Sequence, residues 1–314
     1  MSGLVSIIIP TQRRPGPLLT AARSALRQTG VAAETLELII VDNDQSPSAR
    51  DLVGQIAAEA PFPVVYVHEP RSGVANARNA AMARARGGLI AFLDDDEEAP
   101  AGWLAALLAV QARFDADVVF GPVRARAPAA VVEHRAYLEH FFSRVGPAEA
   151  GMIDDYFGCG DSLIRRAALP NPDRPFSEAR NHTGGEDDLL FGQMKAAGAR
   201  FAWAPQAFVF EDPVPERLNL DYAIARAFAY GHGPTIHCAA STPPDWPGVA
   251  RWMVIGLGQA AVYGTWALVQ WLARSPGRAF ALDRAARGLG KTLWWGPFRL
   301  QFYGRTAPNE GAAG

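Results

Sequence analysis

The chain has 314 residues, of which 49% are hydrophobic and 20% are charged, which is ordinary for a soluble globular protein with an ample core. The formal net charge of -2 gives no general basic field of the kind that binds nucleic acid. The two cysteines, Cys159 and Cys238, form no CxxC pair, which argues against structural zinc and a disulfide framework and fits a reducing compartment. The N-terminus runs directly into an apolar segment, so we expect no signal peptide.

Short apolar runs alternate with helical patterns through residues 1–120. We expect strands at residues 5–10, 36–41, 64–67, 89–93 and 118–120, and helices at 18–28, 48–59, 74–86 and 103–113. Strands that alternate with helices of this length are typical of βαβ units. The sequence therefore predicts an α/β protein with a mainly parallel sheet.

The rhythm changes after Gly121 and Pro122. Here we expect a helix at residues 131–145, a short strand within 157–165, a helix at 186–197, an aromatic strand segment at 201–210 and a helix from 219 or 220 to 230. Gly198 follows the third of these segments and favours a helix end there.

An apolar strand, residues 89–93, leads directly into five acids, residues 94–98. The carboxyl end of such a strand is where open α/β sheets bind ligands. Adjacent carboxylates repel one another unless a positive charge is present, and a divalent metal carrying a diphosphate would supply it. Hard oxygen ligands suit Mg²⁺ or Mn²⁺. A solvated acidic turn or helix start would look the same in the sequence.

Five short motifs follow one another in a specific order: IIIPT at residues 7–11, VDND at 41–44, GVANARN at 73–79, LDDD at 93–96 and GGEDD at 184–188. Together they resemble the family 2 glycosyltransferases, over about residues 4–235, and within that family the bacterial exopolysaccharide enzymes of succinoglycan type. The resemblance implies the GT-A fold, in which a mainly parallel, doubly wound sheet carries helices on both faces. It also implies an inverting transfer from a nucleotide-diphosphate sugar, most simply a UDP-sugar, with Mg²⁺ or Mn²⁺ held by a D-x-D motif.

The resemblance assigns roles to residues in the first half of the chain. Thr11 and Asp42 would line the nucleotide pocket, with Asp42 accepting a hydrogen bond from the base. Arg78 would lie beside the base or the phosphates. From the residues alone, the alternative for Asp42 is a turn-forming aspartate, and the alternative for Arg78 is a surface arginine on a helix.

In the acidic motif, Asp96 would coordinate the metal that bridges the two phosphates, and Asp94 would contact the ribose or the metal shell. Asp95 is the variable middle position of this nucleotide-sugar-binding motif. A third metal ligand could be Glu211 or Asp212, where relatives often carry a histidine.

The acceptor side carries a second acidic group, Glu186-Asp187-Asp188. Inverting transfer needs one carboxylate that deprotonates the acceptor hydroxyl. The family's E-D pair makes Asp187 the base and Glu186 a group that holds sugar hydroxyls, while Asp188 leaves a one-position ambiguity. The alternative is that these acids only complement a helix start.

The roles of two further acceptor-side residues are open. Asp161, in the glycine-rich block 158–166, stands where relatives often have Asn. Arg226 could neutralise the diphosphate, or could equally form a salt bridge on a helix surface.

Residues 252–273 carry no charge and could cross a bilayer, and basic residues dominate beyond them. A single span would place that basic segment outside, against the positive-inside tendency. We therefore expect a re-entrant or interfacial segment at the cytoplasmic face of the bacterial inner membrane, anchored by residues 293–295 and 302–303. The alternative is a buried helix or a dimer interface. The expected division is a catalytic region of residues 1–235, with a nucleotide-sugar half (1–120) and an acceptor half (121–235), and a helical, membrane-associated region of residues 236–314.

The expected partners are the sugar donor, a glycan or polyprenyl-linked acceptor and the membrane surface, without nucleic acid. A sugar nucleotidyltransferase would carry a glycine-rich loop after the first strand, where this chain has a single glycine, Gly16. A non-catalytic nucleotide-sugar-binding protein would have no need for Glu186 and Asp187. A dinucleotide oxidoreductase would show G-x-G-x-x-G after the first strand, which is missing here.

Overall fold

The computed structural model describes residues 3–181 and 184–298. The chain forms two compact units: residues 1–125 with 143–212, and residues 126–142 with 213–314. It therefore passes from one unit to the other three times, after Ala125, Phe142 and Asp212. The predicted catalytic region of residues 1–235 has other bounds, but it describes function and stays a prediction.

The first unit is built on an eight-stranded sheet with the order β3-β2-β1-β4-β9-β6-β10-β8. Its strands are β1 (Val5–Thr11), β2 (Leu36–Asp42), β3 (Val64–His68), β4 (Leu89–Phe92), β6 (Val118–Phe120), β8 (Gly151–Ile153), β9 (Ser162–Arg165) and β10 (Phe201–Trp203). Strands β3, β2, β1 and β4 are parallel, as are β6 and β10. Strand β9 runs antiparallel between β4 and β6, and β8 runs antiparallel to β10. The predicted mainly parallel sheet is confirmed.

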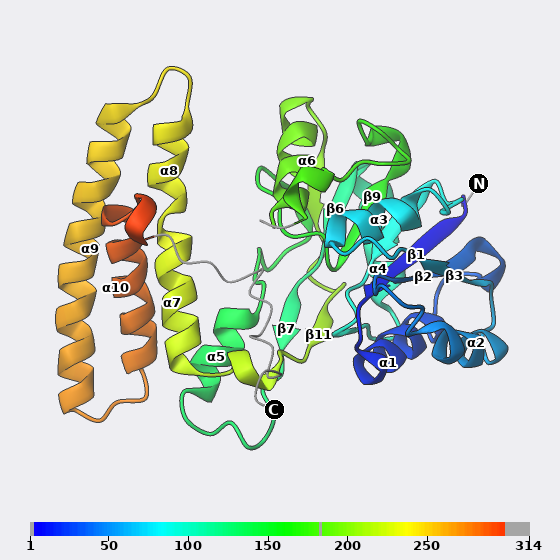
Figure 1. Cartoon of the computed structure of the whole chain (residues 1–314), viewed down its shortest axis with the longest axis horizontal. Helices are drawn as coiled ribbons and strands as arrows, with labels where there is room; N and C mark the ends of the chain where they lie inside the picture. The colour runs from blue at the N-terminus through cyan, green and yellow to red at the C-terminus, as the bar shows by residue number, and fades with distance from the viewer. Residues whose placement is uncertain (1–2, 182–183, 299–314) are drawn as a thin grey trace, which may run out of the picture. The chain divides into compact units, whose positions relative to one another are not determined.

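Helices cover both faces of this sheet (Figure 1). Successive residues of a strand point to opposite faces, so Ile7 and Ile9 join one buried cluster and Ile8 joins the other. The first cluster includes side chains of α1 (Pro15–Leu26), α2 (Arg50–Ala58) and α4 (Trp103–Phe114), and the second includes those of α3 (Val74–Met82) and α6 (Glu186–Ala196). Burial on both faces explains why the strands are apolar without alternation.

A small second sheet has the order β5-β11-β7, from β5 (Glu97–Glu98), β11 (Val209–Glu211) and β7 (Val123–Ala125). The prediction of one strand segment at residues 201–210 is therefore wrong, because this stretch forms β10 and β11 in two different sheets. The chain turns between them at Pro205, which has no N–H to donate to a strand ladder.

The second unit is helical in the residues that the structure describes: α5 (Arg135–Phe142), α7 (Leu220–Gly231), α8 (Gly233–Ala240), α9 (Trp246–Leu272) and α10 (Arg278–Thr292). Helix α5 is shorter than the predicted 131–145, since His134 at φ +57° lies outside the helical region. Helix α8 was not predicted from the sequence.

Helices α9 and α10 are antiparallel neighbours in close contact (Figure 1). A Cβ added to Gly256 would lie 2.5 Å from the carbonyl oxygen of Gly288, so only glycine allows this approach. The opposite side of α9 exposes large apolar side chains, among them Val254, Leu257, Val262, Trp266, Leu268 and Trp271. By length and composition α9 could cross a membrane. Of an 18-residue apolar stretch of this helix, 11% is buried within the structure. Arg299, Phe302, Tyr303 and Arg305 of the basic, aromatic segment lie outside the described residues.

Candidate active site

The acidic motif follows β4, and its central residue faces the end of β1. Thr11 Oγ1 donates a hydrogen bond to Asp95 Oδ2 at 2.7 Å. The Arg14 guanidinium reaches the same cluster and lies 2.6 Å from Asp95 Oδ1 and 3.0 Å from Asp96 Oδ2. Burial raises the pKa of Asp95 to about 6, against the opposing effect of Arg14. Thr11 therefore holds Asp95 directly, and Arg14 links Asp95 to Asp96. Arg14 belongs to none of the sequence motifs, although it lies in a basic segment after the first strand.

Arg78 lies on the buried side of α3 and connects the two acidic motifs. Its Nη1 is 2.5 Å from Glu186 Oε1, and its Nη2 is 3.5 Å from Asp94 Oδ1. Burial alone would lower the pKa of Arg78, but the surrounding anionic groups outweigh it and raise that pKa. Both Arg78 and Glu186 are buried, so Arg78 is no surface arginine, and its charge is already shared between two carboxylates.

Glu97 and Asp94 form a tight turn at the end of β4. Asp94 N donates to Glu97 Oε2 at 2.8 Å, and Glu97 N donates to the Asp94 carbonyl oxygen at 3.1 Å. Burial, followed by the nearby Asp94 and Asp161 carboxylates, raises the pKa of Glu97 well above its usual value. Burial also raises the pKa of Asp94, with Asp96 and Asp187 adding to it. This concentration of carboxyl groups favours a bound cation.

Asp187 lies in the first turn of α6, beside the glycine-rich loop before β9. Its Oδ2 accepts a hydrogen bond from Cys159 N at 3.1 Å, and its Oδ1 accepts from Asp188 N at 2.9 Å. Asp187 is half-buried, whereas Asp188 is exposed. A Cβ added to Gly160 would lie 2.6 Å from Asp94 Oδ2, so the same loop contacts carboxylates of both acidic motifs.

Asp42 lies in an internal network at the end of β2. Its oxygens accept hydrogen bonds from Asp44 N, Ser48 Oγ, Ala49 N and Tyr66 Oη, at 2.7 to 3.3 Å. Burial, and then Asp42 itself, raises the pKa of Tyr66 to about 12. Asp42 thus stabilises the turn into α2, as the turn-forming alternative predicts. Its contact with a nucleotide base stays a prediction, and a base would have to compete with these four donors.

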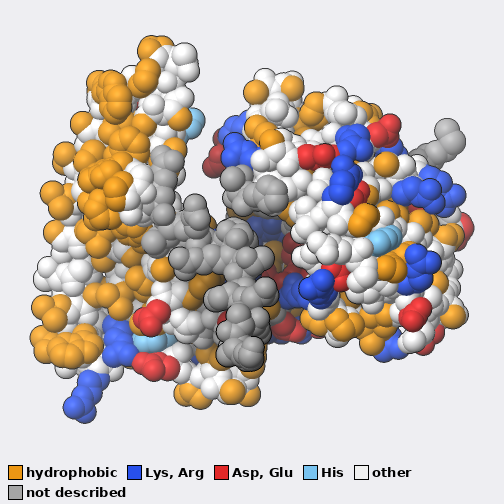
Figure 2. Space-filling view, in the orientation of Figure 1, with side chains coloured by type: hydrophobic (Ala, Val, Ile, Leu, Met, Phe, Trp, Pro, Cys, Tyr) orange, Lys and Arg blue, Asp and Glu red, His pale blue; other side chains and the backbone are white. Residues whose placement is uncertain are grey.

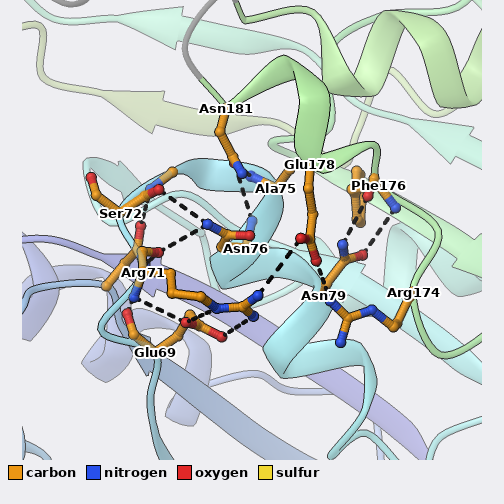
Figure 3. Close-up of polar contacts among 12 residues, drawn as sticks. Glu69, Arg71, Ser72, Ala75, Asn76, Asn79, Arg174, Phe176, Glu178 and Asn181 are labelled. Carbon is orange, nitrogen blue, oxygen red and sulfur yellow. Dashed lines mark hydrogen bonds and ion pairs between the residues drawn. The ribbon is translucent and has the colours of Figure 1, made fainter.

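The start of α3 is held by a distant segment, residues 174–181 (Figure 3). Asn181 Oδ1 accepts hydrogen bonds from Ala75 N at 3.0 Å and from Asn76 N at 3.3 Å, so it caps the helix from outside. Asn79 exchanges two hydrogen bonds with the backbone of Phe176, at 2.8 and 3.0 Å. These contacts fix the helix that carries Arg78 and were not predictable from local sequence.

Two remaining candidates, Asp212 and Arg226, have different surroundings. Asp212 N donates to the Asp96 carbonyl oxygen at 3.3 Å, and both residues line a small cavity of about 180 Å³ together with Glu97 and Glu98. Arg226 lies on α7 in the second unit, where its Nη2 donates to Tyr230 Oη at 2.8 Å. The proposed contact between Arg226 and a diphosphate stays a prediction.

The acidic side of this site suits a metal that the substrate helps to bind. Among residues 3–181 and 184–298, no group of three or more His, Cys, Asp and Glu side chains is arranged to hold a metal ion by itself. Mg²⁺ commonly uses one or two carboxylates together with substrate phosphates. Asp94 and Asp96 could supply these carboxylates, provided that Arg14 gives up part of its contact with Asp96.

Comparison with known proteins gives consistent matches. The Glycos_transf_2 model, described as glycosyl transferase family 2, matches residues 6–170. The succinoglycan biosynthesis protein ExoM of Rhizobium meliloti (strain 1021) is 37% identical over 233 residues, which cover 73% of this chain and 74% of that protein. The pre-mycofactocin glycosyltransferase of Mycobacterium tuberculosis (strain ATCC 25618 / H37Rv) is 27% identical and matches over 72% of this chain and 46% of that protein.

Solved structures share the fold at low sequence identity. S. aureus TarS 1-349 in complex with UDP superposes with a TM-score of 0.53 and 16% identity, over 91% of this chain and 89% of that one. GalNAc-T7 with UDP, GalNAc and Mn²⁺ gives a TM-score of 0.54 and 15% identity, over 74% of this chain and 50% of that one.

Proposed function

This chain belongs to glycosyl transferase family 2 and has its GT-A fold, and on that basis we propose an inverting, metal-dependent transfer from a UDP-sugar. The proposed acceptor is a hydroxyl of a glycan or polyprenyl-linked oligosaccharide in cell-surface or exopolysaccharide synthesis. The relative ExoM is named for succinoglycan biosynthesis, which supports this acceptor class. Two solved proteins of the same fold are in complex with UDP, which supports UDP as the nucleotide of the donor.

One observation carries the proposal. The loop at Gly158–Gly160 lies against Asp187 on one side and against Asp94 on the other. In an inverting displacement the base and the leaving diphosphate stand on opposite faces of the sugar ring, as two carboxyl groups do in inverting glycosidases. The backbone of one loop thus contacts both the proposed base and a donor-side carboxylate, which supports placing the two groups in one site.

The residues divide the chemistry between them. Asp187 would accept the proton of the acceptor hydroxyl as it attacks the anomeric carbon. Glu186 is tied to Arg78 and would orient Asp187 and sugar hydroxyls instead of accepting the proton. Asp94 and Asp96 would hold Mg²⁺ or Mn²⁺, which when bound offsets the negative charge of the leaving diphosphate. Thr11 would keep Asp95 in place beside them.

The second unit suits a lipid-linked acceptor. Helix α9 exposes a broad apolar face (Figure 2), and Arg251 and Arg274 lie near its two ends. Apolar side chains with basic flanks favour the interface of an anionic bilayer. We propose that α9 lies against the cytoplasmic face of the inner membrane, where a polyprenyl-linked acceptor would be available.

A donor panel tests the proposed function. The full-length protein is incubated with UDP-, GDP- and dTDP-sugars and Mn²⁺ or Mg²⁺, and release of the nucleoside diphosphate is measured. We expect one UDP-sugar to be hydrolysed in a metal-dependent reaction. Release of pyrophosphate from a nucleoside triphosphate and a sugar 1-phosphate would instead indicate a nucleotidyltransferase. Binding without turnover, even with lipid-linked acceptors, would indicate a nucleotide-sugar-binding protein.

A further inference from the structure

Arg144 belongs to none of the sequence motifs, yet its side chain contacts the backbone of the glycine-rich loop at residues 158–161. The chain re-enters the first unit at Ser143, and Arg144 exchanges two backbone hydrogen bonds with Val123, at 2.9 and 3.2 Å. The Arg144 side chain is 13% exposed, and its guanidinium lies 5.7 Å from the centre of the Phe157 ring. Its backbone and its side chain are therefore both fixed.

The guanidinium is bonded to backbone carbonyl oxygens. Nε donates to Gly121 at 2.8 Å, Nη1 to Gly158 at 3.0 Å, and Nη2 to Gly160 at 2.8 Å and to Asp161 at 3.0 Å. Nη2 also lies 3.4 Å from Asp161 Oδ2. Four carbonyl contacts from one side chain need the planar, forked donor set of arginine, which a lysine ammonium cannot reproduce.

The loop that Arg144 holds contacts both acidic motifs. Cys159 N donates to Asp187 Oδ2 at 3.1 Å. A Cβ at Gly160 would lie 2.6 Å from Asp94 Oδ2 and 2.9 Å from Glu97 Oε1, so backbone alone fits there. A shift of this loop would move Asp187 relative to Asp94 without changing either side chain.

We propose that Arg144 is a positioning residue for sugar transfer, which sets the separation of Asp187 and Asp94 through the Gly158–Gly160 backbone. The inference rests on the proposed function, because it takes Asp187 as the base and Asp94 as part of the donor side. Arg144 touches neither carboxylate and performs no chemistry. Since misplacement by about 1 Å can cost about a hundredfold in rate, a loosened loop should lower kcat strongly.

The test uses Arg144→Lys and Arg144→Ala in the full-length protein, with Arg165→Lys as the matched control. Arg165 lies at the far end of β9, where it pairs with Asp115 instead of the loop. We expect kcat to fall by about 10- to 100-fold in both Arg144 variants, while UDP affinity in the presence of Mn²⁺ stays within about twofold. The control should keep its kcat. Guanidinium at millimolar concentration should restore part of kcat in Arg144→Ala, because it can occupy the vacated site, and should not accelerate the wild type.

Two outcomes would overturn the inference. One is an unchanged kcat in Arg144→Lys and Arg144→Ala. The other is a parallel loss of kcat, UDP affinity and melting temperature without guanidinium rescue, which would make Arg144 a residue of folding alone. If Arg144→Ala does not fold, Arg144→Lys, which keeps the positive charge, carries the test: its kcat should fall at retained UDP affinity, and a normal kcat in that folded variant would contradict the proposal. Failure of the proposed function is distinguishable, since the wild type would then transfer no sugar.

Discussion

Arg78 Nη1 and Glu186 Oε1 lie 2.5 Å apart although 108 residues separate them in the chain. Both side chains are buried, and Arg78 also lies 3.5 Å from Asp94. This pair links α3, in the half of the chain predicted to hold the donor, to α6, which carries the proposed base. A substitution of either residue would therefore alter the surroundings of both helices.

Removal of one partner of this pair should be strongly destabilising, because it leaves the other charge buried and uncompensated. We expect Glu186→Gln and Arg78→Gln each to lower the free energy of unfolding by about 3–5 kcal/mol. Removal of the exposed pair Arg23–Glu59, by Glu59→Gln, should cost less than about 1 kcal/mol. Urea unfolding measures all three, and equal small losses would contradict the role of a buried ion pair.

Asp96→Asn should remove metal-dependent UDP binding and leave the fold intact. Asp96 follows β4 and lies outside the apolar core, so its loss creates no cavity. Calorimetry with UDP and Mn²⁺ should show no metal-dependent increase in affinity, while the far-UV spectrum stays that of the wild type. Asp51→Asn, on the exposed side of α2, is the control. Wild-type affinity in the Asp96 variant would assign the metal to other residues.

Asp187→Asn should impair transfer and spare donor binding. A group that accepts a proton only in the transition state affects turnover far more than ground-state affinity. We expect transfer to be slower by at least about a hundredfold at nearly unchanged UDP-sugar affinity. Asp188→Asn is the matched neighbour: inactivity of that variant with an active Asp187→Asn would shift the assignment by one residue. Normal transfer by both variants would show that these acids only complement the start of α6.

Asp161 should make stability depend on pH. Burial raises its pKa to about 7, although Arg144 and the Trp103 indole act in the opposite direction. An aspartate in the unfolded chain has a pKa near 4. Between about pH 4 and 7 the folded state therefore holds a proton that the unfolded state has lost, and the free energy of unfolding falls as the pH rises. The full effect is about 4 kcal/mol at most.

The Asp161→Asn variant removes this titration and keeps an acceptor for Trp103 Nε1. Its melting temperature relative to that of the wild type should therefore rise from pH 5 to pH 8. Glu97 is a nearby titratable acid whose pKa the Asp161 carboxylate helps to raise, so the comparison is repeated with Glu97→Gln in both proteins to remove its contribution. A melting-temperature difference that is constant with pH would show that Asp161 is ionised throughout this range.

Helix α9 should bind anionic membranes. The full-length protein should sediment with phosphatidylglycerol vesicles more than with phosphatidylcholine vesicles, since apolar contact and basic flanks act together. Val262→Glu with Trp266→Glu, on the exposed face of α9, should abolish sedimentation. Val132→Glu, at an exposed apolar position of the same unit, should leave it unchanged. A protein that stays in solution with both lipids would make α9 a packing surface for protein.

The sequence predicts the fold better than the site. Apolar runs such as residues 36–41 report burial on two faces, and they place the parallel strands correctly. Short strands such as β5 and β8 depend on partners far along the chain, and local pattern cannot reveal them. Side-chain contacts between distant residues are hidden in the same way. The sequence shows Arg78 only as an arginine on a helix, and its contact with Glu186 is visible only in the folded chain.

Residues outside the motifs were missed for a related reason. Arg144 stands alone in the sequence, and its partners are backbone carbonyl groups that carry no sequence signature. Arg14 was visible as a basic residue, but its contact with Asp95 and Asp96 depends on the pairing of β1 with β4.

The path of the chain constrains how its helical unit could be exchanged or removed. Because the chain passes between its two units three times, each unit contains segments that are not contiguous in the gene. A single crossover could therefore not exchange the helical unit for another one. A truncation after α8 would also remove α10, whose Gly290 packs against the backbone of Phe228 on α7. Replacement of the helical unit as a block would therefore require exchange of two separate chain segments, residues 126–142 and 213–314.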